Sequence, residues 1–340
     1  MRYPRFWQRR GPLAWLLWPL GALVCREAAR RLRRARPEPL DRPVVVVGNL
    51  SVGGTGKTPV VIALVEALRT AGWTPGVVSR GFGVKVGIEP MDLAEADGPA
   101  VCGDEPWLIH TRCDVPVVVH PRRRQAAGQL LARYPEVDVI VSDDGLQHHR
   151  LPRDVEWVIV DGRRGLGNGF CLPAGPLREH PRRLGSVDAV LVNGGGDAPG
   201  LPRGENGAPL GEWIDFALQR FRDLHDGSVV PVERLRGERV TGMAGIGNPE
   251  RFFARLEEEG LIVDRVPLDD HAAPDPDRIA RLQRKGRRIV ITEKDAVKWP
   301  LPPRGPGEVL VAEGGISLPQ TAVARLLATL DARRTQQTSR

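Results

Sequence analysis

The chain has 340 residues, of which 41% are hydrophobic and 27% charged, a composition typical of globular proteins with a buried core. The length predicts one large domain or two ordinary ones, and the composition excludes a wholly disordered chain, a collagen-like repeat and a polytopic membrane protein. The four cysteines are scattered without a C-x-x-C pair, which argues against a zinc knuckle or a disulfide scaffold and indicates a reducing compartment.

The net charge of +7 is concentrated at the N-terminus. Residues 1–36 contain ten arginines and a single acid, Glu27, so the rest of the chain carries a slightly negative balance. Because the body is not basic and aromatic residues make up only 5% of the chain, the sequence does not favour nucleic acid as a partner.

Residues 11–25 (GPLAWLLWPLGALVC) form an uncharged apolar run between arginines. As a helix this run would be about 22 Å long, shorter than the ~30 Å hydrocarbon core of a bilayer, and Pro19 interrupts it. The short run, its two tryptophans (Trp15 and Trp18) and the flanking arginines predict that residues 1–36 anchor the chain to one leaflet of a membrane surface. A cleaved signal peptide and a buried helix of the soluble fold remain alternatives.

The sequence from residue 44 predicts a phosphate-binding loop. Valines 44–47 indicate a strand buried on both faces of a parallel sheet, and a glycine-rich loop and an apolar-periodic helix follow. In such a loop, backbone amides and the helix N-terminus bind phosphate oxygens, so ATP is the expected cofactor. The candidate nucleotide-binding residues of the loop are Ser51, Val52, Gly53, Gly54, Thr55, Gly56, Lys57 and Thr58.

Within this loop, Lys57 is expected to reach the β- and γ-phosphates, and the Thr58 hydroxyl to hold Mg²⁺. The pattern departs from the usual G-x-x-x-x-G-K-[ST] because Ser51 occupies the place of the first glycine. A glycine-rich turn that binds no ligand is the alternative interpretation.

A second apolar strand, in residues 137–144, ends in Asp143 and Asp144. Two adjacent carboxylates at the end of a strand are costly unless a cation neutralises them. Together with Thr58 they form the predicted Mg²⁺ site, although a solvated turn remains possible.

Further strings carry a resemblance to a known family. Residues 143–148 (DDGLQH) and 168–179 (NGFCLPAGPLRE) resemble tetraacyldisaccharide 4'-kinase, the lipid A kinase of Gram-negative bacteria. Other matching strings extend the resemblance in the right order over nearly the whole chain: GNLSVGGTGKTP at 48–59, GDEP at 103–106, DDH at 269–271 and TEKDAVK at 292–298.

This resemblance implies transfer of the ATP γ-phosphate to the 4'-hydroxyl of tetraacyldisaccharide 1-phosphate, which gives lipid IVA. It also implies work at the cytoplasmic face of the bacterial inner membrane, and the N-terminal arm independently indicates a membrane surface. Two alternatives stay open. One is a P-loop kinase or ATPase acting on a soluble metabolite, which would have no use for residues 11–25, and the other is a nucleotide-switched membrane scaffold that transfers no phosphate.

The resemblance also assigns residues. The family's catalytic Asp–His dyad maps to Asp104 in GDEP and His271 in DDH, and which of the two takes the proton is left open. Lys57 joins them because its charge would neutralise the transferred phosphate. The remaining candidates for the nucleotide site are Arg123, Gln147, His148, Arg178 and Glu179. A solvated helix start for Arg123 and a structural ion pair for Arg178 and Glu179 are the alternatives.

Apolar runs alternate with helical patterns and predict an α/β fold. After the arm (residues 1–36), residues 37–172 are expected to form a P-loop NTPase-like parallel sheet domain, with Asp104 in it. Residues 173–340 are expected to form a second, smaller α/β domain that carries His271 and closes over the active-site cleft. The expected strands are 44–47, 75–79, 115–119, 137–141 and 156–160 in the first domain, and 187–192, 240–244, 262–266, 288–292 and 308–312 in the second.

Overall fold

A computed structural model describes residues 3–81, 87, 89–204, 207–269, 276–284, 286–299 and 307–338. The chain divides into two compact units. The large unit comprises Arg2–Phe216 and Ile316–Arg340, and the small unit comprises Ala217–Gly315.

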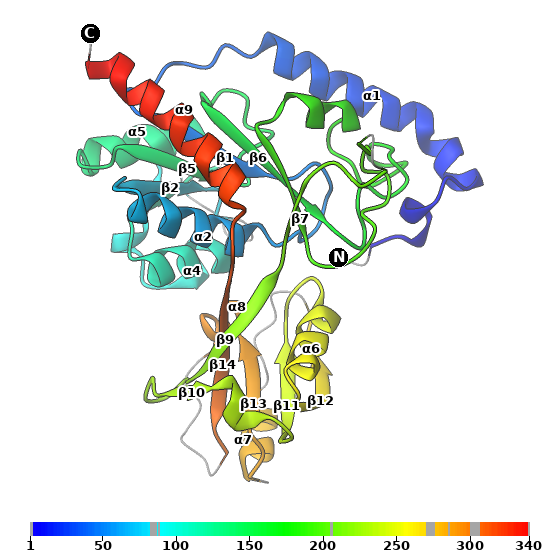
Figure 1. Cartoon of the computed structure of the whole chain (residues 1–340), viewed down its shortest axis with the longest axis vertical. Helices are drawn as coiled ribbons and strands as arrows, with labels where there is room; N and C mark the ends of the chain where they lie inside the picture. The colour runs from blue at the N-terminus through cyan, green and yellow to red at the C-terminus, as the bar shows by residue number, and fades with distance from the viewer. Residues whose placement is uncertain are drawn as a thin grey trace. The chain divides into compact units, whose positions relative to one another are not determined.

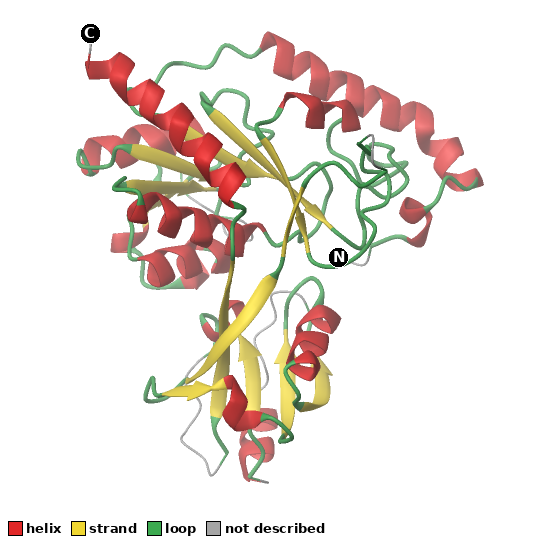
Figure 2. Ribbon diagram, in the orientation of Figure 1, coloured by secondary structure: helices red, strands yellow, loops and turns green. Residues whose placement is uncertain are grey.

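The large unit contains an eight-stranded sheet with the order β3-β4-β2-β5-β1-β6-β7-β8 (Figures 1 and 2). The strand pairs are parallel except for β3 with β4. The central strands are buried on both faces, which explains why they consist largely of valine. The strands are β1 (Val44–Gly48), β2 (Pro75–Ser79), β3 (Met91–Asp92), β4 (Val117–Val119), β5 (Val139–Asp143), β6 (Val155–Asp161), β7 (Ala189–Asn193) and β8 (Glu212–Ile214).

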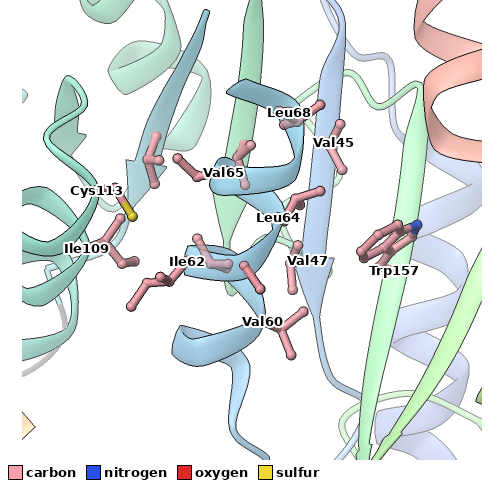
Figure 3. Packing of buried hydrophobic residues seen from close by; sticks show 14 of the residues in the cluster. Val45, Val47, Val60, Ile62, Leu64, Val65, Leu68, Ile109, Cys113 and Trp157 are labelled. Atoms are coloured by element: carbon pink, nitrogen blue, oxygen red, sulfur yellow. The ribbon is translucent and has the colours of Figure 1, made fainter. Parts of the chain in front are cut away.

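Helices cover both faces of this sheet. Successive residues of β1 point to opposite faces, so its valines pack with different helices on the two sides. Val45 and Val47 pack with α2 and with Trp157 of β6 (Figure 3), in a cluster that also includes residues of α4 and α9. Val44 and Val46 pack with α5 instead. The helices of the large unit are η1 (Arg5–Gln8), α1 (Pro12–Arg34), α2 (Lys57–Thr70), η2 (Leu93–Glu95), α3 (Pro99–Cys102), α4 (Asp104–Cys113), α5 (Arg123–Arg133), η3 (Pro181–Ser186) and α9 (Gln320–Thr338).

The N-terminal arm is a helix that extends beyond the apolar run. The helix α1 has 23 residues and contains Pro19. One side of it packs closely on the body, since a Cβ at Gly21 would lie 2.6 Å from the carbonyl oxygen of Cys171. Seven of its large apolar side chains are exposed: Leu13, Trp15, Leu16, Trp18, Leu20, Leu23 and Val24. None of the helices described is both long and apolar enough to cross a membrane.

The scattered cysteines did not predict the disulfide that joins Cys25 of α1 to Cys171. The two Cα atoms lie 5.9 Å apart although 146 positions separate them in the sequence. Cys102 and Cys113 are buried and are not part of a disulfide. Folding of α1 against the segment around residue 171 brings the pair together, and spacing along the chain carries no sign of such a contact.

The large unit continues well past residue 172, where the sequence placed the domain boundary. The strand predicted at 187–192 is β7, which pairs in parallel with β6 over Trp157–Asp161 and so extends the first sheet rather than starting a second. The helix α9 also returns to the large-unit core. These are long-range pairings, and local sequence patterns do not specify the partner of a strand.

The small unit contains a six-stranded sheet with the order β10-β9-β14-β13-β11-β12 (Figure 1). Its strands are β9 (Phe216–Asp223), β10 (Val229–Pro231), β11 (Arg239–Ala244), β12 (Ile262–Pro267), β13 (Ile289–Thr292) and β14 (Val309–Ile316), where β9 and β14 cross the unit boundary. Its helices are η4 (Val232–Leu235), α6 (Pro249–Glu258), α7 (Pro276–Arg284) and α8 (Glu293–Ala296).

The TEKDAVK string has a structural role in the small unit. Both carboxylate oxygens of the buried Asp295 accept from the amide of Gly245 at 3.1 Å, and Thr292 Oγ1 donates to Oδ2 at 2.7 Å. The ammonium of Lys298 lies 3.1 Å from the same carboxylate. These contacts fix the turn after β11 and the start of α8.

Candidate active site

The glycine-rich loop connects β1 to α2 in the large unit. Lys57 and Thr58 are the first residues of α2, so the unpaired amides of its first turn border the loop. Gly53 and Gly56 have φ angles of +95° and +81°, which glycine adopts without strain. A Cβ at Gly56 would lie 2.0 Å from Nδ2 of Asn193, so a larger residue would collide there. The loop therefore has the close backbone packing that phosphate-binding loops require.

Ser51 stands where the usual loop pattern has glycine, and the structure explains why serine fits. It forms an antiparallel β-bridge with Leu177, an extended conformation that any residue can adopt. The amide of Val52 donates to the carbonyl of Pro176 at 2.9 Å. Residues 176–177 therefore hold the start of the loop.

Lys57 lies against one of the two predicted metal ligands. Its Nζ lies 3.5 Å from Oδ1 of Asp144, and Nη1 of Arg178 lies 3.4 Å from the same oxygen. Burial alone would raise the pKa of Asp144, but Lys57 and Arg178, with a smaller contribution from Arg123, outweigh burial and lower it. Asp144 is therefore a carboxylate at neutral pH with two cationic side chains beside it.

Asp143, the last residue of β5, is buried. Its Oδ2 accepts a hydrogen bond from Ser79 Oγ at 3.1 Å, whereas Oδ1 has no hydrogen-bond partner among the residues described. Burial, and then the negative charge of Glu105, raise the pKa of Asp143 to about 6. A buried carboxylate oxygen without a donor is an atom that a cation would satisfy.

Protein side chains alone do not form a metal cage here. Within the described ranges, no group of three or more His, Cys, Asp or Glu side chains is arranged to hold a metal ion. An Mg²⁺ ion at Asp143 would thus need further oxygens from phosphate or water, which is usual for Mg²⁺ in nucleotide sites.

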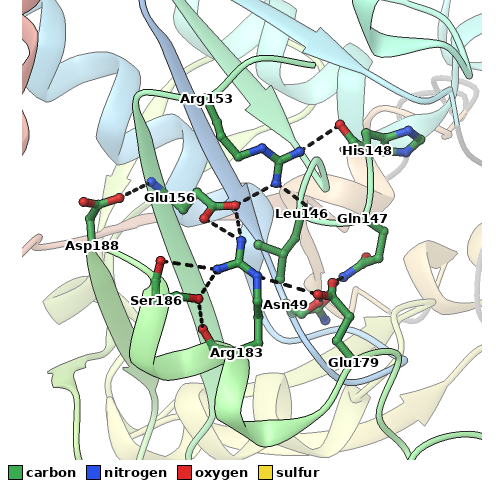
Figure 4. Close-up of polar contacts among 10 residues, drawn as sticks. All are labelled: Asn49, Leu146, Gln147, His148, Arg153, Glu156, Glu179, Arg183, Ser186 and Asp188. Atoms are coloured by element: carbon green, nitrogen blue, oxygen red, sulfur yellow. Dashed lines mark hydrogen bonds and ion pairs between the residues drawn. The ribbon is translucent and has the colours of Figure 1, made fainter. Parts of the chain in front are cut away.

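Gln147 links Arg178 to Glu179. Nη1 of Arg178 donates to Gln147 Oε1 at 3.1 Å, and Gln147 Nε2 donates to Glu179 Oε1 at 2.7 Å. Glu179 is buried, and burial raises its pKa. Arg183 lies between Glu179 and Glu156 (Figure 4), and its Nε is 3.7 Å from Oε2 of Glu179. This network holds the loop after Asp144 against residues 178–179.

The side chain of Arg123 is buried and contacts main-chain carbonyls. Its guanidinium donates to the carbonyls of His120 at 2.9 Å and Asp143 at 3.3 Å, and burial lowers its pKa to about 10. These contacts differ from the solvated helix start that was the alternative to a phosphate clamp.

Burial and then Arg123 lower the pKa of His148 to about 4, so His148 is neutral at pH 7.

Asp104 and Glu105 begin α4, directly after Gly103, which has a φ of +97°. The charge of Glu105 acts on Asp143, which relates the first turn of α4 to the end of β5. His271 lies outside the described residues, so the pairing of Asp104 with His271 stays a prediction.

Several side chains at this edge were not predicted. Ser79 and Asn193 end β2 and β7, Arg164 follows β6, and Asn49 follows β1. The parallel topology contains the signal that could have found them, because the carboxyl ends of parallel strands meet at one edge of the sheet. Glu105 was passed over beside Asp104.

Comparison with known proteins identifies one family. The family model described as tetraacyldisaccharide-1-P 4'-kinase matches residues 13–331. A tetraacyldisaccharide 4'-kinase of Hydrogenovibrio crunogenus is 42% identical over 306 residues, which cover 88% of this chain and 89% of the relative. Another from Shewanella pealeana is 45% identical over 304 residues, which cover 86% and 87%.

The fold is also that of a solved structure. A crystal structure of LpxK from Aquifex aeolicus in complex with ATP superimposes with a TM-score of 0.71 at 23% sequence identity. The match covers 94% of this chain and 99% of that one. At this identity the likeness concerns the fold alone.

Proposed function

Because this chain belongs to the tetraacyldisaccharide 4'-kinase family, we propose that the edge of the large-unit sheet around Lys57 and Asp144 is where it carries out the family reaction. The chain is a kinase that transfers phosphate from ATP to the 4'-hydroxyl of tetraacyldisaccharide 1-phosphate in lipid A biosynthesis. A soluble acceptor and a scaffold without activity are set aside by this membership. The observation that carries the placement is the Lys57–Asp144 contact beside a glycine-rich loop.

In this proposal the loop residues Ser51–Thr58 bind the phosphates of ATP. Free amides at the start of α2 and the positive end of the helix favour phosphate oxygens. The ammonium of Lys57 lies close enough to Asp144 to move between this carboxylate and a phosphate. Arg178, which contacts the same carboxylate, keeps it neutralised when Lys57 leaves it.

The chemistry of the donors fits Mg²⁺. Asp143 supplies an unpartnered buried oxygen, Asp144 an ionised carboxylate, and Thr58 a hydroxyl at the start of α2. When bound, the ion neutralises phosphate charge. Arg123 holds the main-chain carbonyl of Asp143, and Ser79 holds one of its carboxylate oxygens. These contacts fix the carboxylate and leave its other oxygen for the ion.

On the basis of the family resemblance, we propose that Asp104 is the base that accepts the proton of the acceptor hydroxyl. His271 would orient Asp104. Asp104 begins α4 beside Glu105, whose charge reaches Asp143. Gln147, His148 and Glu179 have a positioning role. Arg153 donates to the carbonyl of His148 at 2.8 Å, and Gln147 donates to the buried Glu179 at 2.7 Å, so the loop after Asp144 is held at two points.

We further propose that α1 docks the enzyme on the cytoplasmic face of the inner membrane. Its exposed leucines and tryptophans form the apolar side, and Arg26, Arg30, Arg31, Arg33 and Arg34 lie towards its C-terminal end. A lipid acceptor requires such a location, because its acyl chains stay in the bilayer.

A transfer assay tests the proposed function. Purified protein, labelled ATP, Mg²⁺ and tetraacyldisaccharide 1-phosphate in mixed micelles should give a bis-phosphorylated lipid, and omission of Mg²⁺ should abolish it. A folded Lys57→Ala variant with wild-type transfer would show that the reaction occurs elsewhere than at this loop.

A further inference from the structure

We propose that Arg164 and Asn193 are positioning residues that fix two consecutive peptide groups of the glycine-rich loop for phosphate binding. Arg164 fixes the carbonyl of Gly54, and Asn193 fixes the carbonyl of Thr55. The inference rests on the proposed role of this loop in binding ATP, and it adds residues outside the loop that determine its conformation.

Arg164 reaches the loop from the turn after β6. Its Nη2 donates to the carbonyl of Gly54 and lies 3.0 Å from Oδ2 of Asp161. A Cβ placed on Gly53 would lie 3.2 Å from Nη1 of Arg164, so the guanidinium lies against both glycines. Its charge is paired with Asp161, whose other oxygen accepts the backbone amide of Arg164 at 2.8 Å.

The N-terminal segment holds the same guanidinium from another side. The Arg164 guanidinium carbon lies 5.5 Å from the ring centroid of Tyr3, which is within the range of a cation–π contact. Tyr3 in turn packs edge-on against the buried Trp7, with ring centroids 5.3 Å apart. Arg164 is therefore held by Asp161 and Tyr3 before any nucleotide binds.

Asn193 acts on the next peptide group. This last residue of β7 donates from Nδ2 to the carbonyl of Thr55 at 2.9 Å, and it is buried. Side chains from the ends of two neighbouring strands, β6 and β7, therefore hold consecutive carbonyls of the loop.

The direction of the amides follows from peptide geometry. In a planar trans peptide, the carbonyl and the N–H of the following residue point in opposite directions. Fixing the Gly54 carbonyl on Arg164 thus directs the N–H of Thr55 away from Arg164, and fixing the Thr55 carbonyl directs the N–H of Gly56 away from Asn193. Amides oriented in advance bind phosphate without an ordering cost at the moment of binding.

Nucleotide affinity tests the inference. We expect Arg164→Ala to weaken ADP and ATP binding, measured by calorimetry, by about tenfold or more, the loss expected when a charge-assisted hydrogen bond disappears. The value of kcat at saturating ATP should change by less than about threefold. Arg163→Ala is the matched control, because it removes the same charge from the same turn at an exposed position.

The outcomes separate the alternatives. An arginine that contacted the γ-phosphate directly would lower kcat and leave ADP affinity unchanged, and an arginine needed only for folding would lower the melting temperature with ADP affinity intact; either result overturns the inference. Asn193→Ala should reproduce the loss of ADP affinity, and it replaces Arg164→Ala if that variant does not fold. Lys57→Ala identifies the other kind of failure: if it binds nucleotide like the wild type, the loop is not the nucleotide site at all.

Discussion

The ammonium of Lys57 lies 3.5 Å from a carboxylate oxygen of Asp144, and this contact joins the first residue of α2 to the residue that follows β5. Both strands that lead to it, β1 and β5, are adjacent and parallel in the sheet. The sheet therefore brings a cation and a carboxylate together. In the proposed site the cation would face phosphate and the carboxylate would face Mg²⁺.

Removal of the Lys57 ammonium should impair the use of ATP. We expect Lys57→Ala to lower kcat/KM for ATP on the order of 100-fold or more, because a phosphate loses its cation in a partly buried site. Asp144 should remain ionised through Arg178. Steady-state kinetics with ATP as the varied substrate measure this effect, and an unchanged kcat/KM would contradict the assignment of the loop.

The raised pKa of Asp143 predicts the pH dependence of Mg²⁺ use. A carboxyl with a pKa of about 6 is protonated below that pH, and Mg²⁺ binds only the ionised form. The KM for Mg²⁺ should therefore rise as pH falls through about 6, by about tenfold per pH unit well below it. A KM for Mg²⁺ that stays constant between pH 5 and 8 would exclude Asp143 as a ligand.

Glu105 provides an internal control for this pH profile. Its negative charge is the second cause of the raised pKa of Asp143, after burial. Glu105→Gln should therefore lower the pKa of Asp143 and move the rise in KM for Mg²⁺ to lower pH. If the profile moves to higher pH or does not move, the charge of Glu105 does not act on Asp143 as the structure indicates.

The raised pKa of Asp143 also makes the stability of the fold depend on pH. The folded state binds a proton at Asp143 more tightly than the unfolded state, so this group stabilises the fold fully only below its unfolded pKa of about 4. Its contribution is lost as pH rises towards about 6. Asp143→Asn should accordingly have a higher melting temperature than the wild type at pH 8, and the difference should shrink at pH 4.5.

The parts of the fold that the sequence predicted are those with a strong local pattern. The valine runs of β1, β2 and β5 are buried on both faces, and their composition alone identifies them. By contrast the burial of residues along β9 follows no regular period and charges lie among them, and β3 has two residues, so neither has a clear pattern. The boundary between the units was misplaced because the pairing of β7 with β6 is a long-range contact.

The candidate site shows the same division. Lys57 and Asp144 follow from a motif and from the end of a strand, and the structure places them in contact. The burial of Arg123 among backbone carbonyls depends on how α5 packs, which local sequence does not specify. Arg164 and Asn193 belong to no motif, and only the order of the strands brings them to the loop.

Asp104 should be needed for chemistry rather than for nucleotide binding. We expect Asp104→Ala to lower kcat by about 10²- to 10⁴-fold, the usual effect of losing a general base, with ADP affinity unchanged. Glu105→Gln, which alters the adjacent residue of the same helix turn, is the control for damage to α4 when both variants are assayed at pH 8 and saturating Mg²⁺, where the effect of Glu105 on Asp143 does not limit activity. A variant of Asp104 that keeps more than about a tenth of the wild-type kcat would remove it from the role of base.

The exposed apolar face of α1 should determine membrane binding. Leu16, Leu20 and Leu23 follow the i, i+4, i+7 spacing of one helix face and are 75%, 53% and 62% exposed. Replacing all three with glutamine should weaken binding to anionic vesicles by about tenfold or more, since each leucine loses the free energy of burial in the acyl region. Sedimentation with vesicles measures the affinity.

A matched variant separates this effect from a general change in surface hydrophobicity. Leu210, Val229 and Ile262 are also exposed, at 51%, 54% and 47%, but lie outside α1. Their replacement with glutamine should leave vesicle binding unchanged. Equal loss of binding in the two triple variants, or none in the α1 variant, would contradict docking through α1. High salt should weaken the wild-type interaction as well, because the arginines of α1 contribute by attraction to lipid phosphates.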